Sequence, residues 1–301
     1  MNGILLLNKR SGISSAKAIN EVKYALKDRG IDVHKIGHCG TLDPLASGLM
    51  VVLINDATKI SDYVLLEDKS YLATIVIGKE YDTLDLEGNL IREDKITKED
   101  FNNIKQNIDQ VLNSLIGPLM QIPPIYSSLK YQGKKLYEYA RNNNPKIDEL
   151  VNKKKREVII HSIEKIKDIE LHNDECLLTI KLRVSKGTYI RSLSKTIGDK
   201  LGYPASIHSL ERLSSGKFEI EKSYTIEDIR VGNFQLLNPL VAFDDYKIIE
   251  VNNEMKKQIL NGMMINLDCT DDVIVLKNND QILAIYEYAN NGKYRAKRVW
   301  N

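Results

Sequence analysis

One stretch, GHCGTLDPLASGLMVVLINDATKI at Gly37–Ile60, constrains the fold of this chain more than any other. Its continuous apolar run, Leu49–Ile54, is typical of a strand buried on both faces. The loop before that strand combines glycines with Asp43-Pro44, and a proline disfavours helical backbone at the residue that precedes it. The sequence therefore predicts an extended, rigid loop that holds the Asp43 carboxylate at the end of a core strand. Such a loop suits a reactive group, whereas a lone Asp-Pro beside glycines is more often an ordinary turn.

Composition indicates an ordinary soluble globular protein, because 43% of the residues are hydrophobic and 28% are charged. A chain of 301 residues can bury one large core, or a core and a small appended module. No apolar run approaches membrane-spanning length, and the N-terminal MNGILLLNKR lacks the basic leader of a signal peptide. Three widely spaced cysteines, Cys39, Cys176 and Cys269, favour a reducing compartment. We therefore expect a cytoplasmic location.

Charge is unevenly distributed, although the net charge is only +2. Residues 80–100 hold eight acids against three bases, whereas residues 121–160 hold nine bases against four acids. The tail Lys293–Arg298 adds four bases and no acid. This asymmetry fits a polyanion held on one face, while a charge run taken alone is more often a solvated surface.

Three further stretches combine chemistry with a clear local pattern. Tyr71–Gly78 alternates polar and apolar residues, as a half-buried strand does. Residues 121–141, QIPPIYSSLKYQGKKLYEYAR, interleave tyrosines with lysines, a mixture that suits phosphate contact and stacking on bases. Leu178–Val184 also alternates, so that Lys186-Gly187 reads as a turn and the next element starts near Arg191.

Together these stretches resemble the TruB-type tRNA pseudouridine synthases. GHCGTLDPLASGLM resembles the catalytic motif of that family, in which the aspartate of GTLDP is essential. Lys69, Tyr71, Ala73 and Gly78 match its KxYxAxxxxG pattern, and SKGTYIRSL, which contains Arg191, matches its third signature. The guide-RNA-dependent synthases of archaea and eukaryotes share the first motif. The resemblance covers almost the whole chain.

The resemblance implies an α+β pseudouridine synthase fold, in which a mixed, mostly antiparallel sheet is flanked by helices. It predicts a catalytic domain over residues 1–243, with an RNA-binding insertion at 121–156. A hinge is expected at Asn238–Asp245, followed at 244–301 by a small PUA-like RNA-binding β module. Other elements expected from the pattern are strands at Ile4–Leu7, Val158–Ile169, Val273–Leu276 and Ile282–Tyr288, a helix capped by Ser14 or Ser15, a helix start at Asn55–Lys59 and a helix at Lys98–Leu115.

The resemblance also implies the reaction, which is isomerisation of the T-loop uridine at position 55 of tRNA to pseudouridine after base flipping. Asp43 is the expected catalytic carboxylate, Arg191 its partner, in a pair that could be bidentate, and Tyr71 the ring beside the displaced base. Expected substrate-binding residues are His38, Lys59, Tyr189, Leu210 and Lys130. We expect no cofactor and no metal, since the chain has no nucleotide-binding glycine pattern and His34, His38 and Cys39 have no further Cys/His pair to complete a zinc site.

Several positions differ from the family pattern. Lys9-Arg10 stands in place of Lys-Pro, which would loosen a turn, and Ser128, Thr196, Ser206 and Glu211 also depart from the usual residues. Two other functions stay open: the catalytic subunit of a guide-RNA particle, and a non-catalytic RNA-binding or RNA-folding protein. The compact length favours a stand-alone enzyme, expected to be monomeric and to act on the T-arm of tRNA without guide RNA or membrane. Retention of Asp43, Tyr71 and Arg191 argues against loss of catalysis.

Overall fold

The computed structural model describes residues 2–65, 67–127, 129–142, 146–172 and 174–300, which form two separate sheets. The first is a ten-stranded sheet whose main path has the order β1-β3-β13-β4-β12-β10-β7, while β2, β14 and β11 pair with β3, β13 and β12 beside this path. The second sheet has the order β15-β17-β18-β19-β16. The strands of the large sheet are β1 Gly3–Lys9, β2 Ile36–His38, β3 Ser47–Ile54, β4 Lys69–Ile77, β7 Gly117–Gln121, β10 Arg156–Lys165, β11 Glu170–His172, β12 Glu175–Val184, β13 Ala205–Ser215 and β14 Phe218–Glu219.

The remaining strands form the second sheet and two short hairpins. The second sheet contains β15 Lys247–Glu250, β16 Ile265–Asn266, β17 Val273–Asn278, β18 Gln281–Asn290 and β19 Lys293–Val299; the hairpins are β5 Lys79–Tyr81 with β6 Leu90–Glu93, and β8 Lys130–Tyr131 with β9 Lys134–Lys135. The helices are α1 Ser15–Asp28, η1 Asn55–Ile60, α2 Ser61–Leu65, α3 Lys98–Asn113, α4 Leu136–Arg141, α5 Ile147–Asn152, α6 Ile190–Leu201, η2 Ile220–Lys222, α7 Ile226–Val231, η3 Pro239–Phe243 and α8 Asn253–Leu260.

The large sheet is mixed and mostly antiparallel, which confirms the predicted fold class. Among the pairings between named strands in the described residues of this sheet, β3 with β13 is the parallel one, and there Arg212 lies opposite Gly48. Gly48 has φ +97°, and a Cβ at this position would lie 2.4 Å from the Arg212 carbonyl oxygen. Only glycine allows the two backbones to approach this closely. The contact brings β13 against the start of β3, the strand that follows the Asp43 loop.

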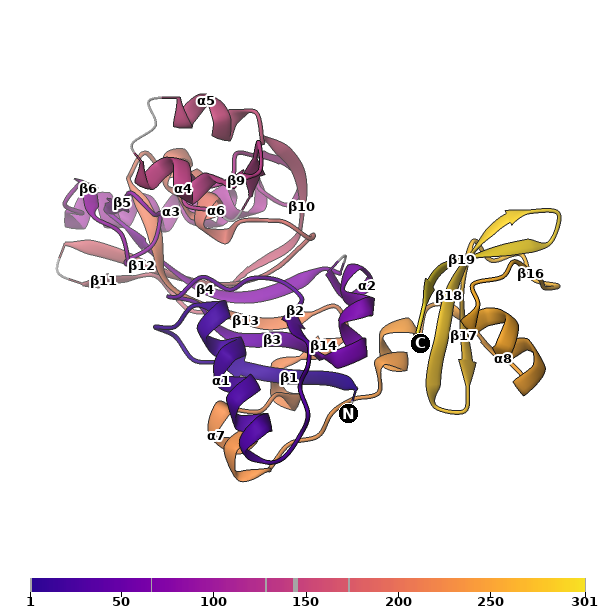
Figure 1. Ribbon diagram of the computed structural model, residues 1–301. Helices are drawn as coiled ribbons and strands as arrows, with labels where there is room; N and C mark the ends of the chain where they lie inside the picture. The colour runs from indigo at the N-terminus through magenta and orange to yellow at the C-terminus, as the bar shows by residue number, and fades with distance from the viewer. Residues whose placement is uncertain (1, 66, 128, 143–145, 173, 301) are drawn as a thin grey trace.

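Helices α1, α3, α6 and α7 cover one face of the large sheet, as Figure 1 shows. Helix α1 starts where the sequence predicts, because the Ser14 hydroxyl accepts a hydrogen bond from the Lys17 N–H. Thr97 and Asp100 form a capping box that starts α3. The opposite face of β1 and β3 packs against η1, α2 and the segment leading to the second sheet.

The connection at Asn238–Asp245, where the sequence predicts a hinge, contains a packed 3-10 helix, η3. The Asn238 side chain caps it by accepting from the Leu240 N–H, and Phe243 is fully buried at its end. Phe243 contacts the rings of Tyr63 and Tyr246 edge-on. An aromatic cluster of this kind packs the connection between the two sheets. The local sequence pattern does not predict that Phe243 is buried there.

Residues 247–299 build the second sheet, which carries α8 and lies at the right of Figure 1. Val275 and Ile285 of this sheet share one apolar cluster with Ile4 and Leu6 of β1. The Trp300 indole N–H also donates to the Asp56 carbonyl at 3.2 Å. The C-terminal β module is therefore docked on the large sheet. Helices α4 and α5 of the segment 121–156 lie at the opposite end of the molecule (Figure 1).

Most predicted elements are present, with differences at their ends. The strand expected over Val158–Ile169 ends at Lys165 and resumes as β11, and both pieces pair with β12. The helix start expected at Asn55–Lys59 is a 3-10 helix, and α3 ends at Asn113 rather than Leu115. Neither short polar breaks nor the hydrogen-bond type of one helical turn can be read from apolar periodicity. No helix in the described part of the chain is long and apolar enough to cross a membrane.

Candidate active site

A buried arginine of the neighbouring strand β13, Arg212, holds the Asp43 loop in place. Arg212 Nε donates to the Leu49 carbonyl at 2.7 Å, and its NH2 group donates to the Gly40 carbonyl at 3.0 Å. Gly40 has φ +102°, and a Cβ there would lie 3.2 Å from Arg212 NH1. The glycines of the loop are therefore needed both for the backbone turn and for the space that the guanidinium occupies. Arg212 connects the two ends of the loop to β13.

Helix α1 holds the residue just before the carboxylate. The buried Ser15 hydroxyl donates to the Leu42 carbonyl at 2.7 Å and accepts from the Leu42 N–H at 2.8 Å. Both backbone polar groups of Leu42 are thus satisfied by one side chain. This two-point contact fixes the direction in which the Asp43 side chain leaves the loop.

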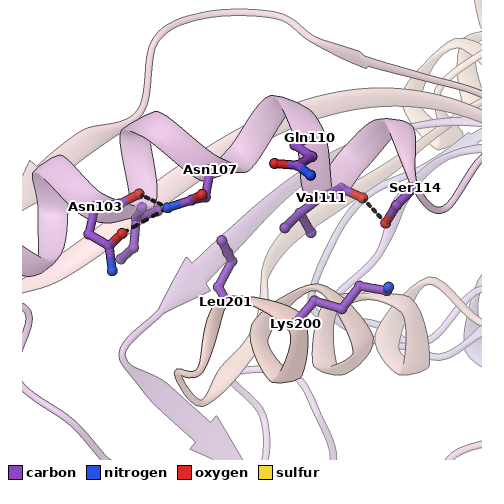
Figure 2. Close-up of a pocket in the computed structure, with 8 residues that line it drawn as sticks. Asn103, Asn107, Gln110, Val111, Ser114, Lys200 and Leu201 are labelled. Atoms are coloured by element: carbon purple, nitrogen blue, oxygen red, sulfur yellow. Dashed lines mark hydrogen bonds between the residues drawn. The ribbon is translucent and has the colours of Figure 1, made fainter.

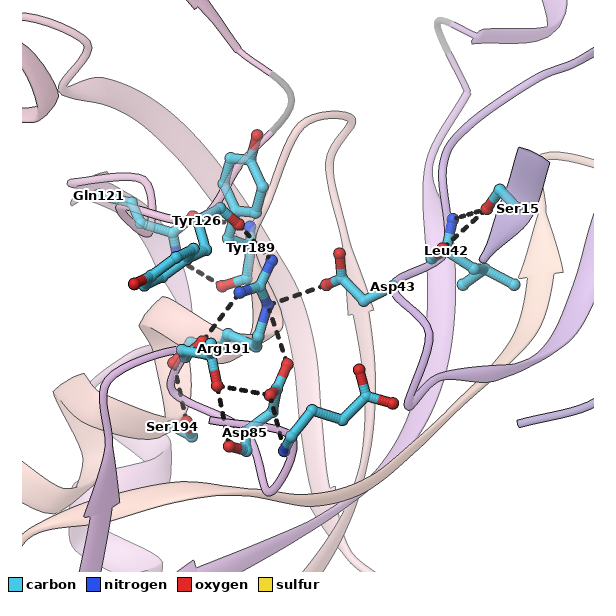
Figure 3. A network of polar contacts seen from close by, with 11 residues as sticks. Ser15, Leu42, Asp43, Asp85, Gln121, Tyr126, Tyr189, Arg191 and Ser194 are labelled. Carbon is cyan, nitrogen blue, oxygen red and sulfur yellow. Dashed lines mark hydrogen bonds and ion pairs between the residues drawn. The ribbon is translucent and has the colours of Figure 1, made fainter. Parts of the chain in front are cut away.

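Arg191, the second residue of α6, lies against Asp43, as Figure 3 shows. Its Nε is 2.8 Å from Asp43 Oδ2, while its NH1 and NH2 groups donate to the carbonyls of Thr83 and Tyr126 at 2.8 and 3.0 Å. The Arg191 side chain is 5% exposed and that of Asp43 is 36% exposed. The expected pair is present as an ion pair through Nε alone and not as a bidentate one, since NH1 and NH2 are directed at backbone carbonyls and Nε has no hydrogen-bond partner among the described residues.

A second carboxylate, which is buried, also lies near the Nε of Arg191. Asp85 Oδ2 is 3.6 Å from Arg191 Nε, and the Asp85 side chain is only 6% exposed. Asp85 Oδ1 accepts from the Thr83 hydroxyl at 2.7 Å and from the Glu87 N–H at 3.2 Å. Burial, followed by the negative charges of Asp85 and Asp43, raises the pKa of Glu87. One cation thus faces a buried acid that can hold it in place and a partly exposed acid that can face a ligand.

Tyr189 is the N-cap residue of α6, and the Gln121 side chain at the end of β7 makes two hydrogen bonds to its backbone. Gln121 accepts from the Tyr189 N–H at 2.8 Å and donates to the Tyr189 carbonyl at 2.9 Å. The Arg156 guanidinium lies 5.2 Å from the centre of the Tyr189 ring. Burial raises the pKa of Tyr189, so its phenol is neutral at physiological pH.

Three other predicted site residues lie on strands near the loop. Tyr71 of β4 is buried and stands opposite Arg212 in the β4–β13 ladder, and Leu210 is a buried residue of β13. His38 is the last residue of β2, immediately before the loop. Its Nδ1 is buried without a hydrogen-bond partner among the described residues. Burial and the nearby Arg212 charge lower the pKa of His38, although a backbone hydrogen bond to Gly40 opposes them.

The two predicted lysines lie away from the Asp43–Arg191 pair in different ways. Lys59 is 3.2 Å from Asp56 Oδ1, 3.5 Å from the Val299 carbonyl and 5.8 Å from the centre of the Trp300 ring. Its ammonium therefore lies where the C-terminal module docks, and its assignment to substrate binding stays a prediction. Lys130 is exposed on β8 of the 121–156 segment.

The departures from the family pattern have local accommodations. Lys9 is buried and donates to the carbonyls of Arg10 and Ile13, so the turn expected to be loosened is held by the lysine. Ser206 accepts from the Tyr81 N–H at 3.0 Å, and the Thr196 hydroxyl bonds back to the Ser192 carbonyl within α6. Glu211 of β13 lies opposite Ser47 of β3. Ser128 falls outside the described residues.

The sequence pattern does not identify three residues that surround the Asp43–Arg191 pair, Asp85, Gln121 and Tyr126, nor the structural role of Arg212. Gln121 and Tyr126 lie in the stretch whose pattern indicates phosphate contact and stacking, and Asp85 is one of the eight acids at residues 80–100. A carboxylate between Thr83 and Glu87 in a turn-rich segment was the available signal for Asp85, since Asp in such a turn bonds its own backbone. Which acid meets the arginine depends on tertiary contact.

A surface groove elsewhere on the protein carries none of these groups. It has a volume of about 390 Å³ and lies between α3 and α6, as Figure 2 shows. Its walls mix amide side chains of α3 with apolar residues, a serine and a lysine, and the Asn107 amide already donates to the Asn103 carbonyl and side chain within α3. Among the described residues there is also no group of three or more His, Cys, Asp or Glu that could hold a metal ion.

Solved structures identify the class to which this fold belongs. A structure described as "Structure of H/ACA RNP bound to a substrate RNA containing 2'-deoxyuridine" superposes with a TM-score of 0.65 at 18% identity, over 99% of this chain and 84% of that chain. The archaeal box H/ACA sRNP Nop10-Cbf5 complex matches with a TM-score of 0.65 at 19% identity, over 99% and 85% of the two chains. The sheet with its appended β module is therefore the Cbf5- and TruB-like pseudouridine synthase fold.

Sequence relatives then define the family. Residues 28–190 match the TruB family pseudouridylate synthase (N terminal domain). tRNA pseudouridine synthase B of Staphylococcus aureus strain MSSA476 is 38% identical over 317 aligned positions, which cover 100% of this chain and 99% of the relative. The enzyme of the same name from strain JH9 is 37% identical over the same coverage. The chain belongs to the TruB family of pseudouridylate synthases, which are isomerases.

Proposed function

We propose that this protein is a stand-alone tRNA pseudouridine-55 synthase that uses Asp43 as its essential catalytic carboxylate. The observation that carries the proposal is the ion pair in which Arg191, buried and fixed by two backbone carbonyls, lies 2.8 Å from the partly exposed Asp43. Full-length similarity to tRNA pseudouridine synthase B supports tRNA as the substrate. The protein would act as a cytoplasmic monomer, without cofactor, metal or guide RNA.

The reaction suits a carboxylate because it requires no other reagent. The N1–C1′ bond of uridine breaks, the uracil turns, and a C5–C1′ bond forms. C5 loses a proton and N1 gains one, so no oxidant, reductant or group donor is consumed. A carboxylate can form a covalent bond to carbon and later leave, as it does in glycoside cleavage. Arg191 would aim Asp43, while Tyr71, Tyr189 and Leu210 would form the walls against which the uracil packs.

Access to the target nucleotide requires flipping, because a base stacked in an RNA loop cannot reach a protein side chain. We assign His38 to the vacated stack, since it lies immediately before the Asp43 loop. The lowered pKa of His38 favours the neutral imidazole, which stacks without adding charge. A stacking ring contributes about 1–3 kcal/mol, which offsets much of the unstacking cost.

RNA binding outside the catalytic centre is assigned to two regions. The catalytic domain would comprise residues 1–243, within which the insertion 121–156 presents the exposed Lys130 and a basic cluster at residues 153–155. Residues 244–301 would form the PUA-like module, docked through Trp300. Phosphate contacts from both regions would position the T-arm over Asp43 without reading its sequence.

The direct test is conversion of an unmodified tRNA transcript by the purified protein, with no guide RNA present. Tritium release from C5-labelled uridine reports turnover, and mass spectrometry locates the product. We expect stoichiometric pseudouridine at position 55, and none in a transcript that carries cytidine there. Absence of product without guide RNA would favour the guide-dependent alternative, and absence under every condition would favour a non-catalytic RNA-binding protein.

The Asp43→Asn variant tests the catalytic assignment separately. Asparagine has nearly the same size and still hydrogen-bonds, but it is neutral and a very poor nucleophile. We expect normal folding and tRNA affinity at least equal to wild type, because loss of a negative charge cannot weaken attraction to phosphate. Turnover should fall by many powers of ten, since the covalent route is gone. Turnover within tenfold of wild type would contradict the assignment.

A further inference from the structure

Gln121 makes an unusual pair of contacts with the residue that caps helix α6. It is the last residue of β7 and is 4% exposed. Its amide oxygen accepts from the Tyr189 N–H at 2.8 Å, and its amide nitrogen donates to the Tyr189 carbonyl at 2.9 Å (Figure 3). A carboxamide has the same donor and acceptor as a peptide group, so the side chain pairs with Tyr189 as a neighbouring strand would.

These two hydrogen bonds matter because Tyr189, the N-cap residue of α6, makes no side-chain cap of its own. Its backbone is extended, with φ −95° and ψ 112°, and no side-chain hydrogen bond closes the N-terminus. Arg191 follows two residues later and must place Nε 2.8 Å from Asp43. A shift of the helix start therefore moves the guanidinium directly. Misplacement of a catalytic group by about 1 Å can cost about a hundredfold in rate.

The same residue is contacted from both ends of the 121–156 segment. Arg156, the first residue of β10, lies opposite Gln121 in the β7–β10 ladder, and its guanidinium lies over the Tyr189 ring. Arg156 also donates to the Gly187 carbonyl. Between these ends, the Tyr126 carbonyl accepts from Arg191 NH2 at 3.0 Å. The base of the segment is thus built around the start of α6.

We propose that Gln121 is a positioning residue that holds Arg191 against Asp43 through the backbone of Tyr189. Gln121 is buried beneath the site, so its effect is on the geometry of the arginine rather than on contact with RNA. The inference deepens the proposed function and rests on it for its rate measurements. A parallel contact exists on the other half of the pair, where Ser15 bonds both backbone groups of Leu42, the neighbour of Asp43.

The variant Gln121→Glu separates positioning from simple packing through its pH profile. A protonated carboxyl offers one donor and one acceptor, like the amide, whereas an ionised carboxylate offers acceptors only and repels the Tyr189 carbonyl. Burial raises the pKa of a carboxyl group and the nearby Arg156 guanidinium lowers it, so the protonated fraction of the new carboxyl increases as the pH falls. Relative to wild type at the same pH, we expect the single-turnover rate to be about a hundredfold lower at pH 8 and to recover as the pH falls towards 5.

Gln121→Met provides the matched case in which neither hydrogen bond can form. Methionine has a similar length and fills the space with an apolar chain. We expect a rate about a hundredfold below wild type at every pH, with tRNA affinity within about threefold. Gln110→Glu and Gln110→Met, on the exposed face of α3, serve as controls and should match wild type throughout.

A second measurement does not depend on turnover. The Arg191 Nε–H resonance, assigned by its loss in Arg191→Lys, should shift or broaden in Gln121→Met and move back towards the wild-type position in Gln121→Glu as the pH falls. If wild type forms no pseudouridine while this resonance responds, the proposed function fails and the positioning role stands. If wild type is active, three results overturn the role: wild-type rates in both variants, a pH-independent ratio for Gln121→Glu, or losses of rate and tRNA affinity in parallel.

Discussion

At the scale of single residues, the contacts of the Arg191 guanidinium use the planar, branched shape that distinguishes arginine from lysine. Two of its nitrogens are committed to the carbonyls of Thr83 and Tyr126, which leaves Nε between Asp43 and Asp85. The carbonyls fix the plane of the group, and Asp85 supplies a buried counter-charge. The result is a cation whose orientation is set before any ligand arrives, and such preorganisation is what lowers barriers in polar sites.

Arg191→Lys should therefore reduce turnover far more than it reduces tRNA affinity. Lysine keeps the charge but cannot reach two carbonyls and a carboxylate in one plane, and the Thr83 and Tyr126 carbonyls would lose their donors. We expect single-turnover rates lower by about a hundredfold or more, and dissociation constants within a few-fold, in paired tritium-release and filter-binding measurements. Wild-type turnover in this variant would show that the fixed fork contributes nothing.

His38 should make stability depend on pH below neutrality. Burial, assisted by the Arg212 charge, lowers the pKa of His38 below its usual 6.5, so the folded state resists a proton that the unfolded state accepts. A group with a lowered folded pKa destabilises the fold as the pH falls from 6.5 towards that pKa. Urea unfolding of wild type and His38→Gln should give a constant difference above pH 6.5 and a growing loss for wild type below it. A difference that stays constant down to pH 5 would contradict this.

At the scale of elements, the Asp43 loop depends on the close parallel contact between β3 and β13. Gly48 lies against the backbone of Arg212, whose side chain then returns to hold Gly40 and Leu49. The loop is thus positioned by strand packing and one buried guanidinium rather than by its own sequence. This arrangement places the greatest sensitivity to substitution at the strand contact.

Gly48→Ala should be severely destabilising, whereas a matched glycine should not. At Gly48 the added methyl would lie 2.4 Å from a backbone oxygen at φ +97°, so the strands must separate. Gly12 also has a positive φ, +82°, but nothing lies within 4 Å of its Cβ position. We expect a loss in unfolding free energy of about 3 kcal/mol or more for Gly48→Ala and about 1–2 kcal/mol for Gly12→Ala. Equal losses in urea titrations would refute the packing argument.

At the scale of the whole molecule, the predicted RNA-binding regions lie at opposite ends. The 121–156 segment stands at one end of the large sheet, and the docked C-terminal module stands at the other (Figure 1). A net charge of +2 conceals this separation, because the acids are concentrated at residues 80–100. Local charge therefore governs association with RNA more than total charge does.

Binding of tRNA should accordingly depend strongly on salt. If about six phosphates are neutralised, counterion release predicts a loss of roughly a thousandfold in affinity between 50 and 200 mM salt on a duplex, and somewhat less on folded RNA. Combined replacement of the exposed Lys134 and Lys155 by glutamine should lower the slope by about two. Lys98→Gln, at the first turn of α3, is the control with an unchanged slope. A flat salt response in wild type would contradict the basic-face interpretation.

Local pattern was sufficient to predict most elements of the fold. The apolar run Leu49–Ile54, the alternation in Leu178–Val184 and the serine before α1 each define an element through neighbours in the chain. Such signals depend on burial at a period of two or of 3.6 residues, and on a cap that bonds three residues away. The motifs then placed Asp43 on a loop and Arg191 at a helix start, as observed.

Tertiary structure alone decided which groups surround that pair. The bonds from Arg191 to Thr83 and Tyr126 span 108 and 65 residues, and the bond from Arg212 to Gly40 spans 172. The packed connection at Phe243 and the docking of Trp300 are likewise made by distant segments. No periodicity encodes such contacts, because a buried polar group takes whatever partner the assembled sheet brings within reach. The sequence by itself determined most strands and the loop that carries Asp43, and the assembled sheet decided what holds that carboxylate in place.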